Sequence, residues 1–314
     1  MTDLSIIIVS WNTKDYLQKC LNSIYENTKG ITFEVIVVDN ASSDASAQMV
    51  KNRFPQAILI ENKENLGFGA ANNQAIKRSR GKYALILNPD TEISGESLNT
   101  MVTFLNENPK VGSVGPKILN PNNSIQLTCA RNYPTLSTEF FWLTTLVRRF
   151  PKNRVMGRYL MSYWDHTDRR EVDCLSGACM MVRRDVLEKM SYFDEDYFMY
   201  GEDVDLCYRI KKAGWQIWYL PEAQIIHYGG ASSKTIFESA TIYDRRAIQL
   251  FFKKHYGRLT AGLYRWMCAF IGFAMLLISG LILIYPFIKE RWKIKKLFLE
   301  NKTILLWALK LKGK

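Results

Sequence analysis

Short apolar runs alternate with amphipathic segments along the first hundred residues of the chain. The runs are rich in β-branched residues, which is typical of strands buried on both faces of a parallel sheet. The predicted strands are residues 4–10, 33–38, 57–61 and 83–87, and the predicted helices between them are residues 13–27, 43–54 and 69–80. This alternation predicts a doubly wound α/β domain, in which ligands bind beyond the carboxyl ends of the strands.

The pattern is less regular in the middle of the chain. We predict strands within residues 111–130, 172–183 and 215–220, and helices over residues 185–190 and 202–213. Residues 131–170 have no clear period and interleave aromatic with basic residues, so they are assigned no element.

An apolar segment follows near the carboxyl terminus. Residues 266–288 hold no charge over 23 positions, which is long enough to span a bilayer. In residues 289–314, apolar side chains recur at helical spacing and most lysines lie off that stripe, as in a helix that lies in the membrane interface. The alternative is a buried core helix followed by a solvated basic tail.

The charge distribution changes how the formal net charge of +12 is interpreted. Residues 1–244 hold 27 Lys and Arg against 28 Asp and Glu, whereas residues 245–314 hold 15 against 2. The excess therefore lies beside the apolar segment, which favours anionic lipid headgroups over nucleic acid as the partner. Both flanks of the segment are basic, so a single crossing and a shallow or re-entrant helix remain open.

The cysteines and the amino terminus indicate a cytosolic environment. The six cysteines form no CxxC pair and have no zinc-site spacing, so we expect reduced thiols, several of them in the core. Met1-Thr2-Asp3 carries none of the basic residues that open a secretory signal.

Several polar residues follow predicted strands and are candidates for chemistry. Asp39 ends a buried strand and could accept hydrogen bonds from a ligand, or could serve as a turn acid. Asn65-Leu66-Gly67-Phe68-Gly69 precedes a helix whose N–H groups could face phosphate, although this signal is weak alone. Asp90, in Leu87-Asn88-Pro89-Asp90-Thr91, is placed to ligate a divalent ion that also holds a diphosphate, or to cap a Pro-containing turn.

Two further candidates lie later in the chain. Glu202, Asp203 and Asp205 open a predicted helix, where they could interact with the helix dipole. Aromatic residues and glycines surround them, so a general base is the competing interpretation. His227 follows an apolar strand and precedes a Gly-Gly turn, which suits either a core histidine or a contact to a metal or diphosphate.

Taken in order, these segments resemble the family 2 glycosyltransferases, which have the GT-A fold. The resemblance covers roughly residues 4–235. It is most specific in LNPDT, in SGACMMVRRDVLEKMSYFDEDYFMYGEDVDLCYR and in HYGGASS, which look most like the rhamnosyltransferase branch that builds bacterial O-antigen and other cell-surface polysaccharides.

The resemblance implies a role for each candidate residue. Ser10 and Trp11 would lie by the nucleotide base, Asp39 would bind the base or ribose, Asn65, Gly67 and Gly69 would line the donor pocket, and Gly177 would sit against the donor sugar. Asn88 and Asp90 stand where the family has its DxD motif, with Asn88 in place of the first acid. Asp90 and His227 would hold Mg²⁺ or Mn²⁺. Asp203 matches the family's base, and Glu202 would support it.

The resemblance also implies an organisation and a place in the cell. Residues 1–240 would be the GT-A catalytic domain, with a nucleotide-sugar-binding half (1–110) and an acceptor-binding, catalytic half (111–240). A basic juxtamembrane linker (241–265), a membrane-embedded helix (266–288) and a basic amphipathic tail (289–314) would follow. Residues 131–170 would cover a lipid-linked acceptor or pack against the membrane.

The expected function is an inverting transfer of a sugar, with L-rhamnose from dTDP-rhamnose as the first choice, to a lipid-linked saccharide. The enzyme would act at the cytoplasmic face of the bacterial inner membrane. Residues 209–215 read RIKKAGW and lack the processive QxxRW motif, which favours single additions. The alternatives are a UDP- or GDP-hexose donor, a sugar nucleotidyltransferase, for which Ser10 to Lys14 lacks the glycines, and an inactive membrane scaffold.

Overall fold

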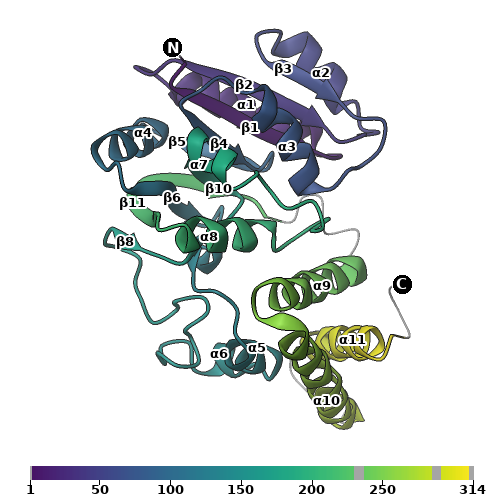
Figure 1. Cartoon of the computed structure of the whole chain (residues 1–314). Coiled ribbons are helices and arrows are strands. Elements are labelled where there is room, and N and C mark those ends of the chain that lie inside the picture. Colours follow the sequence, from purple (N-terminus) through teal and green to yellow (C-terminus); the bar gives the residue numbers. More distant parts are fainter. Residues whose placement is uncertain (1, 230–236, 285–290, 311–314) are drawn as a thin grey trace. The chain divides into compact units, whose positions relative to one another are not determined.

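The computed structural model describes residues 2–229, 237–284 and 291–310. Its chain forms two compact units (Figure 1). The first, called the sheet unit, comprises Met1–Tyr133 and Leu160–Lys234, and the second, called the helical unit, comprises Pro134–Tyr159 and Thr235–Lys314. The last residues of the HYGGASS motif (230–233) and of the predicted membrane segment (285–288) lie outside the described residues.

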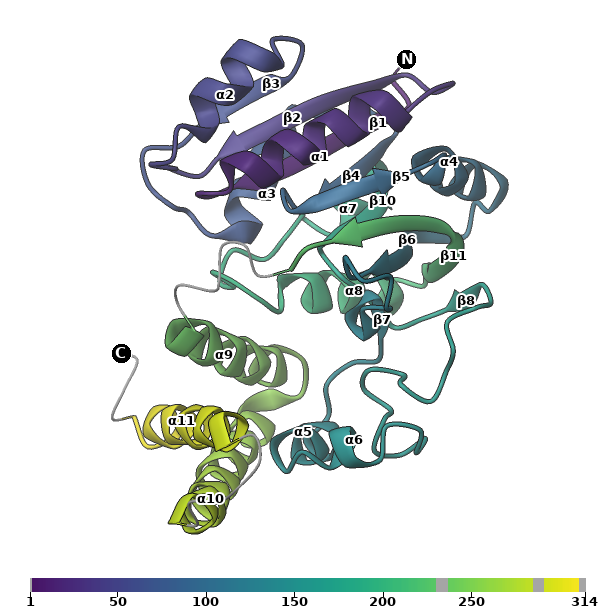
Figure 2. The ribbon, with the colours of Figure 1, turned by 180° about the vertical axis from the view of Figure 1, so that it is seen from behind.

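The amino-terminal half of the sheet unit has the predicted alternation of strands and helices. Parallel strands lie in the order β3-β2-β1-β4. The strands are β1 (Leu4–Ser10), β2 (Phe33–Asp39), β3 (Ile58–Glu61) and β4 (Tyr83–Leu87), and the helices are α1 (Lys14–Asn27), α2 (Ser46–Arg53) and α3 (Phe68–Arg78). Every residue of β1 and β4 is buried, as their apolar runs predict. Helices α1 and α3 cover opposite faces of the sheet (Figures 1 and 2).

The sheet continues with strands of both directions. The strand β10 (Cys179–Arg183) is antiparallel to β4 and to β6 (Val111–Leu119). The strand β11 (Gln216–His227) runs parallel to β6 and antiparallel to β5 (Thr91–Ser94) and β8 (Arg170–Glu171). A separate pair joins β7 (Ala130–Arg131) to β9 (Cys174–Leu175). The predicted doubly wound mixed sheet is therefore confirmed.

Some elements were not predicted from the sequence. In the sheet unit these are β5 and α4 (Ser97–Glu107), which buries Leu98, Met101 and Leu105 at helical spacing. In residues 131–170 the structure has α5 (Leu136–Leu143), which begins with a Thr135–Thr138 capping box, and α6 (Leu146–Arg149). Residues 241–265, where a linker was expected, lie in α9 (Phe237–His255) and the first turns of α10 (Gly257–Ile284). The remaining elements are η1 (Leu127–Cys129), α7 (Arg184–Lys189), α8 (Glu202–Lys212) and α11 (Arg291–Ala308).

The strand directions bring distant residues to one edge of the sheet. Ser10, Asp39 and Glu61 are aligned at the ends of β1, β2 and β3. Because β10 is antiparallel to β4, Gly177 precedes β10 at the edge where β4 ends. His227 ends β11 opposite Thr91, the first residue of β5. The carboxyl edge of the sheet thus collects most of the candidate residues.

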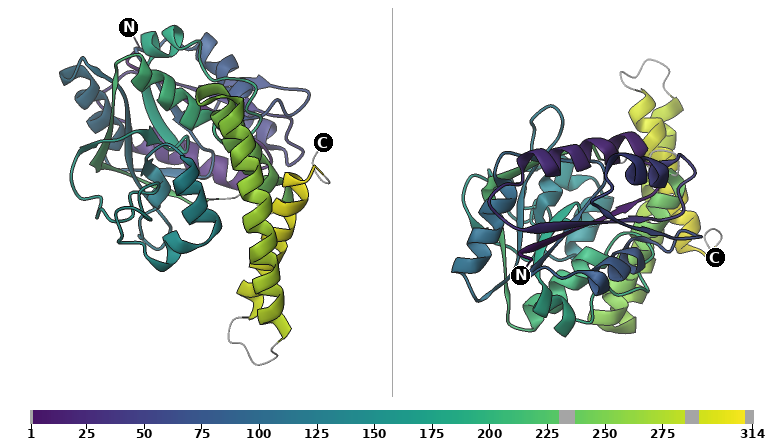
Figure 3. Two further views of the ribbon diagram at one scale, coloured as in Figure 1. Left: turned by 60° about the horizontal axis from the view of Figure 1, so that its bottom comes forward. Right: turned by 90° about the horizontal axis from the view of Figure 1, so that it is seen from above.

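In the helical unit, α10 and α11 pack antiparallel along most of their length (Figure 3). Arg265, near the start of α10, donates to the carbonyls of Trp307 and Ala308, and Arg291, at the start of α11, donates to the carbonyl of Leu283. Gly272 lies where the two helices face each other, and a Cβ there would make an ordinary contact of 3.5 Å with the Asn301 carbonyl oxygen. By length and composition α10 could cross a membrane.

Many large apolar residues of α10 are exposed. They recur every three or four positions and form an exposed stripe, here called the α10 stripe: Leu259, Leu263, Trp266, Phe270, Phe273, Leu277, Leu281 and Ile284. The first half of α11 is basic and exposed, at Arg291, Lys293, Lys295 and Lys296. An exposed apolar stripe of this length, next to clustered cations, is typical of a helix that contacts a membrane.

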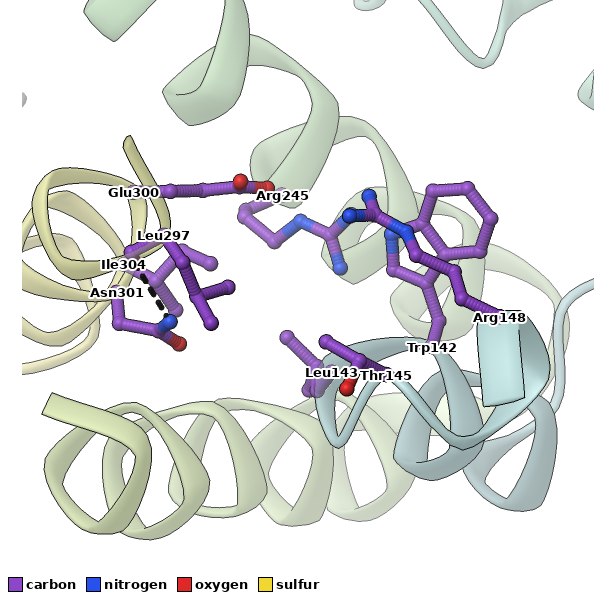
Figure 4. A pocket seen from close by; sticks show the side chains of 9 residues that line it. All are labelled: Trp142, Leu143, Thr145, Arg148, Arg245, Leu297, Glu300, Asn301 and Ile304. Atoms are coloured by element: carbon purple, nitrogen blue, oxygen red, sulfur yellow. Dashed lines mark hydrogen bonds between the residues drawn. The ribbon is translucent and has the colours of Figure 1, made fainter. Parts of the chain in front are cut away.

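A buried ion pair ties α5 to the carboxyl-terminal helices of the helical unit. Arg245 Nη1 of α9 lies 2.9 Å from Glu139 Oε2 of α5 and 3.1 Å from the Tyr264 hydroxyl of α10. Asp244 also contacts Arg245. Burial raises the pKa of Glu139 to about 7 in spite of this arginine. Beside the pair is a small pocket, into which Arg245 and Arg148 point toward one another (Figure 4).

We predict that Arg245→Met destabilises the helical unit by about 3–5 kcal/mol at pH 8, because it leaves the buried Glu139 carboxylate without its partner. The loss should shrink at pH 6, where Glu139 takes up a proton. Thermal unfolding in detergent and proteolysis between α5 and α6 would measure it, with Arg245→Met/Glu139→Leu as the matched control that restores stability. Equal losses in both variants at both pH values would contradict the assignment.

Candidate active site

The end of β2 has two functional groups of different character. Asp39 is buried, and its Oδ2 accepts a hydrogen bond from the Ser42 amide at 3.0 Å, whereas its Oδ1 is buried without a hydrogen-bond partner. A buried carboxylate oxygen without a partner is costly unless something completes it, so this atom is a candidate for binding a ligand. Ser10, next to it in the sheet, is itself bonded to Thr13.

Asn40, the next residue, holds the Asn65–Gly69 loop. Its Nδ2 lies 2.8 Å from Asn65 Oδ1, and its Oδ1 accepts from the Leu66 amide at 3.1 Å and from Asn62 at 3.0 Å. Asn65 Oδ1 also accepts from the Gly67 amide. Gly67 needs its glycine, because φ is +84° and a Cβ would lie 2.4 Å from the Phe198 carbonyl oxygen.

The amides that lead into α3 have acceptors within the protein. The amides of Leu66, Gly67 and Phe68 are all occupied by internal acceptors, the last by the Phe198 carbonyl at 3.0 Å. These three amides are therefore engaged within the protein. Binding of phosphate by the later N–H groups in the first turn of α3 stays a prediction. Gly69 packs against Phe193, with room for only a tight Cβ contact of 3.4 Å. Through these hydrogen bonds the loop connects Asn40, at the sheet edge, with Phe198, in the segment that precedes α8.

Asp90 and His227 meet across the β5–β11 pair. His227 Nε2 lies 3.2 Å from Asp90 Oδ1 and 3.4 Å from Asn88 Nδ2. On the other side of the ring, Nδ1 lies 2.8 Å from Gln126 Oε1. Gln126 Nε2 donates to the His227 carbonyl at 2.7 Å and to Asn120 Oδ1 at 2.9 Å, which fixes the amide orientation. We therefore assign a proton to Nδ1, and Nε2 faces Asp90.

The pair fits a divalent cation in its chemistry. A carboxylate oxygen and an imidazole nitrogen are suitable ligands, and a histidine ligand usually donates its second N–H to a carbonyl group, as here to Gln126. Among the described residues, no group of three or more His, Cys, Asp and Glu side chains is placed to hold a metal. The protein would thus supply two ligands, and diphosphate and water would complete the shell.

Asp203 lies at the first turn of α8 and is tied to the sheet edge. Its Oδ2 accepts from the Gly177 amide at 3.0 Å and from Arg131 Nη2 at 2.6 Å. Its Oδ1 accepts from the Val204 amide at 2.8 Å. A Cβ at Gly177 would lie 3.5 Å from Asp203 Cβ, which is an ordinary contact. The carboxylate is therefore held in one orientation close to the site where β4 and β10 meet.

Glu202 differs from its neighbour. It is buried, and its Oε2 has no hydrogen-bond partner. Burial, together with the adjacent Asp203 carboxylate, raises the pKa of Glu202 to about 8. Glu202 is thus protonated at neutral pH, and it lacks the hydrogen-bond donors that surround Asp203.

The structure joins the predicted residues into three local groups at one edge. The first contains Asp39 with Asn65 and Gly67, the second contains Asn88, Asp90 and His227, and the third contains Gly177, Glu202 and Asp203. Trp11 follows the end of β1 and is half-buried. Three residues that organise these groups were missed: Asn40, Gln126 and Arg131. Only Asn40, beside Asp39, had a positional signal in the sequence.

Known proteins resemble the chain in sequence and fold. The glycosyl transferase family 2 model matches residues 5–191. The N-acetylglucosaminyl-diphospho-decaprenol L-rhamnosyltransferase of Mycobacterium tuberculosis is 31% identical over 245 residues, which cover 74% of this chain and 78% of that protein. Rhamnosyltransferase WbbL of Escherichia coli is 29% identical over 244 residues, which cover 75% and 87%.

A solved structure supports the fold at lower identity. Mannosyltransferase PcManGT from Pyrobaculum calidifontis, in complex with GDP-Man and Mn²⁺, superposes with a TM-score of 0.61 at 18% identity. The match covers 99% of this chain and 88% of that one, and it bears on the fold alone.

The raised pKa of Glu202 makes stability depend on pH. The neutral form of Glu202 contributes its full stabilisation of the fold at pH values below the ordinary pKa of 4.5. This contribution is lost as the pH rises toward the pKa of about 8 in the folded protein. Glu202→Gln cannot ionise, so we expect this variant to gain in unfolding free energy relative to the unmodified protein between pH 5 and pH 8.5. Urea titrations would measure the gain, with Glu188→Gln on the exposed side of α7 as the control. A difference that does not change with pH would contradict the prediction.

Proposed function

The chain belongs to glycosyl transferase family 2 and has the GT-A fold, and from that premise we propose that it transfers L-rhamnose from dTDP-rhamnose to a lipid-linked saccharide. The observation that carries the proposal is the gathering of Asp39, the Asp90–His227 pair and Asp203 at one edge of the sheet. The names of both relatives supply the sugar, and the name of the mycobacterial relative supplies the lipid-linked acceptor.

In this proposal the β1 and β2 ends bind the nucleotide. The unpartnered Asp39 Oδ1 accepts a hydrogen bond from the base or ribose, and Ser10 and Trp11 lie beside the base. Asn65, Gly67 and Gly69 line the donor pocket, and Gly177 lies against the sugar. Asn40 acts on the donor only through the loop that it holds.

Asp90 and His227 would hold Mg²⁺ or Mn²⁺, with Asn88 next to them. The ion, when bound, supplies positive charge to the diphosphate that leaves. Gln126 keeps a proton on Nδ1 of the His227 ring. The chain therefore provides an oriented site for the leaving group without a second acidic ligand from Asn88.

Asp203 is the proposed general base. It removes the proton from the acceptor hydroxyl, whose oxygen forms a bond to the anomeric carbon of the sugar. The bond from that carbon to the diphosphate oxygen breaks on the opposite side, so the nucleoside diphosphate leaves and the configuration inverts. Glu202, which is buried beside Asp203, supports the base from its protonated form.

The test is transfer by the purified protein with Mn²⁺, a polyprenyl-diphosphate-linked saccharide and a panel of dTDP-, UDP- and GDP-sugars. We expect product from dTDP-rhamnose. Asp203→Asn should keep nucleotide binding and lose transfer by ~10²–10⁴-fold, the usual worth of a positioned base. Asp205→Asn, on the same helix but paired with Arg209, is the matched control. Full transfer by Asp203→Asn would refute the role of this residue, and transfer from another donor alone would refute the rhamnosyl assignment.

The helical unit supports a proposal for localisation. We propose that residues 245–314 attach the enzyme to the cytoplasmic face of the inner membrane, with α10 and α11 lying in the interface rather than crossing it. The α10 stripe would face the acyl chains along its whole length. If the pair crossed the bilayer instead, exposed Lys295, Lys296 and Lys302 of α11 would enter the membrane alongside α10. Each would cost about 2.5–3.5 kcal/mol at the bilayer centre.

Cysteine labelling tests this topology, because all six native cysteines are buried and free. Arg258→Cys marks the start of α10, and Lys295→Cys marks the opposite end of the antiparallel pair. We expect a membrane-impermeant maleimide to label both sites in inside-out vesicles and neither in intact spheroplasts. Labelling of Lys295→Cys from the outer face would show that the helices cross the membrane. The unmodified protein controls for background labelling.

A further inference from the structure

Arg131 contacts the proposed base but belongs to none of the motifs in the sequence. It lies in β7, which pairs antiparallel with β9. Gly177, at the sheet edge, follows the end of β9 by two residues. Its Nη2 is 2.6 Å from Asp203 Oδ2, and the two side chains are only 14% and 11% exposed. A charge-assisted bond that is largely removed from water orients both partners more strongly than a surface pair does.

The two acids at the start of α8 have unequal surroundings. Asp203 accepts from Arg131, from the Gly177 amide and from the Val204 amide. Glu202 is equally buried, yet its Oε2 has no partner. Two adjacent carboxylates in a buried site resist being ionised together, and the one with the donors carries the charge.

Other titratable groups near the pair do not compete with Arg131. Tyr197 interacts electrostatically with Asp205 and more weakly with Glu202. Cys207, on the next turn of α8, interacts with Asp203 and is hydrogen-bonded with Cys174 of β9. Burial raises the pKa of Tyr197, and a hydrogen bond with Cys174 together with burial raises the pKa of Cys207, so both stay neutral near pH 7. Asp205 is paired with Arg209 at 2.7 Å.

We propose that Arg131 is a positioning residue that selects Asp203, and not Glu202, as the ionised base of the transfer reaction. It occupies Oδ2 and leaves the second lone pair of Oδ1 for the proton of the acceptor hydroxyl. The single negative charge of the acid pair therefore stays on the carboxylate that faces the Gly177 edge. This inference rests on the proposed function, since it takes Asp203 as the base.

The test is the pH dependence of kcat/KM in Arg131→Gln and Arg131→Lys. Removing a cation in direct contact raises a carboxyl pKa by about 1–3 units. We therefore expect the acidic limb of the Arg131→Gln profile to move to higher pH by about that amount, with a larger loss of activity at pH 6 than at pH 9. Arg131→Lys keeps the charge, so its acidic limb should move part of the way back toward that of the unmodified protein. The affinity for dTDP should be unchanged in both variants.

Arg209→Gln is the matched control, because it removes another Arg–Asp pair of α8 away from the proposed base. It should lower stability and leave the position of the acidic limb where it is. A loss in Arg131→Gln that is equal at every pH would overturn the inference while leaving the proposed function intact. Full activity of Asp203→Asn would instead remove Asp203 as the base, which is the part of the proposed function on which the inference rests. If Arg131→Gln does not fold, an unshifted acidic limb in Arg131→Lys with reduced kcat still contradicts the charge-selection role.

Discussion

The register between β5 and β11 is the constraint on which the candidate site depends. Asn88 and Asp90 follow the parallel strand β4, and His227 ends a strand that begins more than a hundred residues later. Backbone pairing of His227 with Thr91 places the imidazole beside Asp90. A slip of one residue in this ladder would turn His227 to the opposite face of the sheet and separate the two groups. The sheet therefore brings Asp90 and His227 together, and Gln126 then keeps a proton on Nδ1 of the His227 ring.

Buried polar atoms without partners occur at several places among the described residues, and two of them belong to the candidate site. Asp39 Oδ1 and Glu202 Oε2 are both buried and unbonded, although the residues around them are well satisfied. Such atoms cost stability, and they are retained most readily where a ligand or a proton completes them. Asn40 shows the opposite arrangement, because its amide is fully engaged in holding the loop. The site thus combines a rigid frame with a few groups left for chemistry.

The sequence was most informative about periodic elements and about residues that follow strands. The runs of β1, β2 and β4 are apolar enough to be recognised as strands from the sequence alone. Their ends then locate Asp39, the last residue of β2, and Asp90, which follows β4. It was least informative where partners are remote. Arg131 and Asp203 are 72 positions apart in the sequence, and Gln126 and His227 are 101 positions apart. Local sequence patterns therefore do not indicate these contacts. The amide of Phe68, at the start of α3, donates to the Phe198 carbonyl, which only the fold brings near.

The central claim is that Asp90 and His227 form the site for the ion that accompanies the nucleoside diphosphate. The most direct measurement is anomalous scattering from a crystal of the protein grown with Mn²⁺ and dTDP. We predict the strongest manganese peak between Asp90 Oδ1 and His227 Nε2, in contact with the diphosphate, while the nucleoside lies at Asp39. Nucleotide bound at Asp39 with manganese on other residues, or with no manganese at the Asp90–His227 pair, would contradict it.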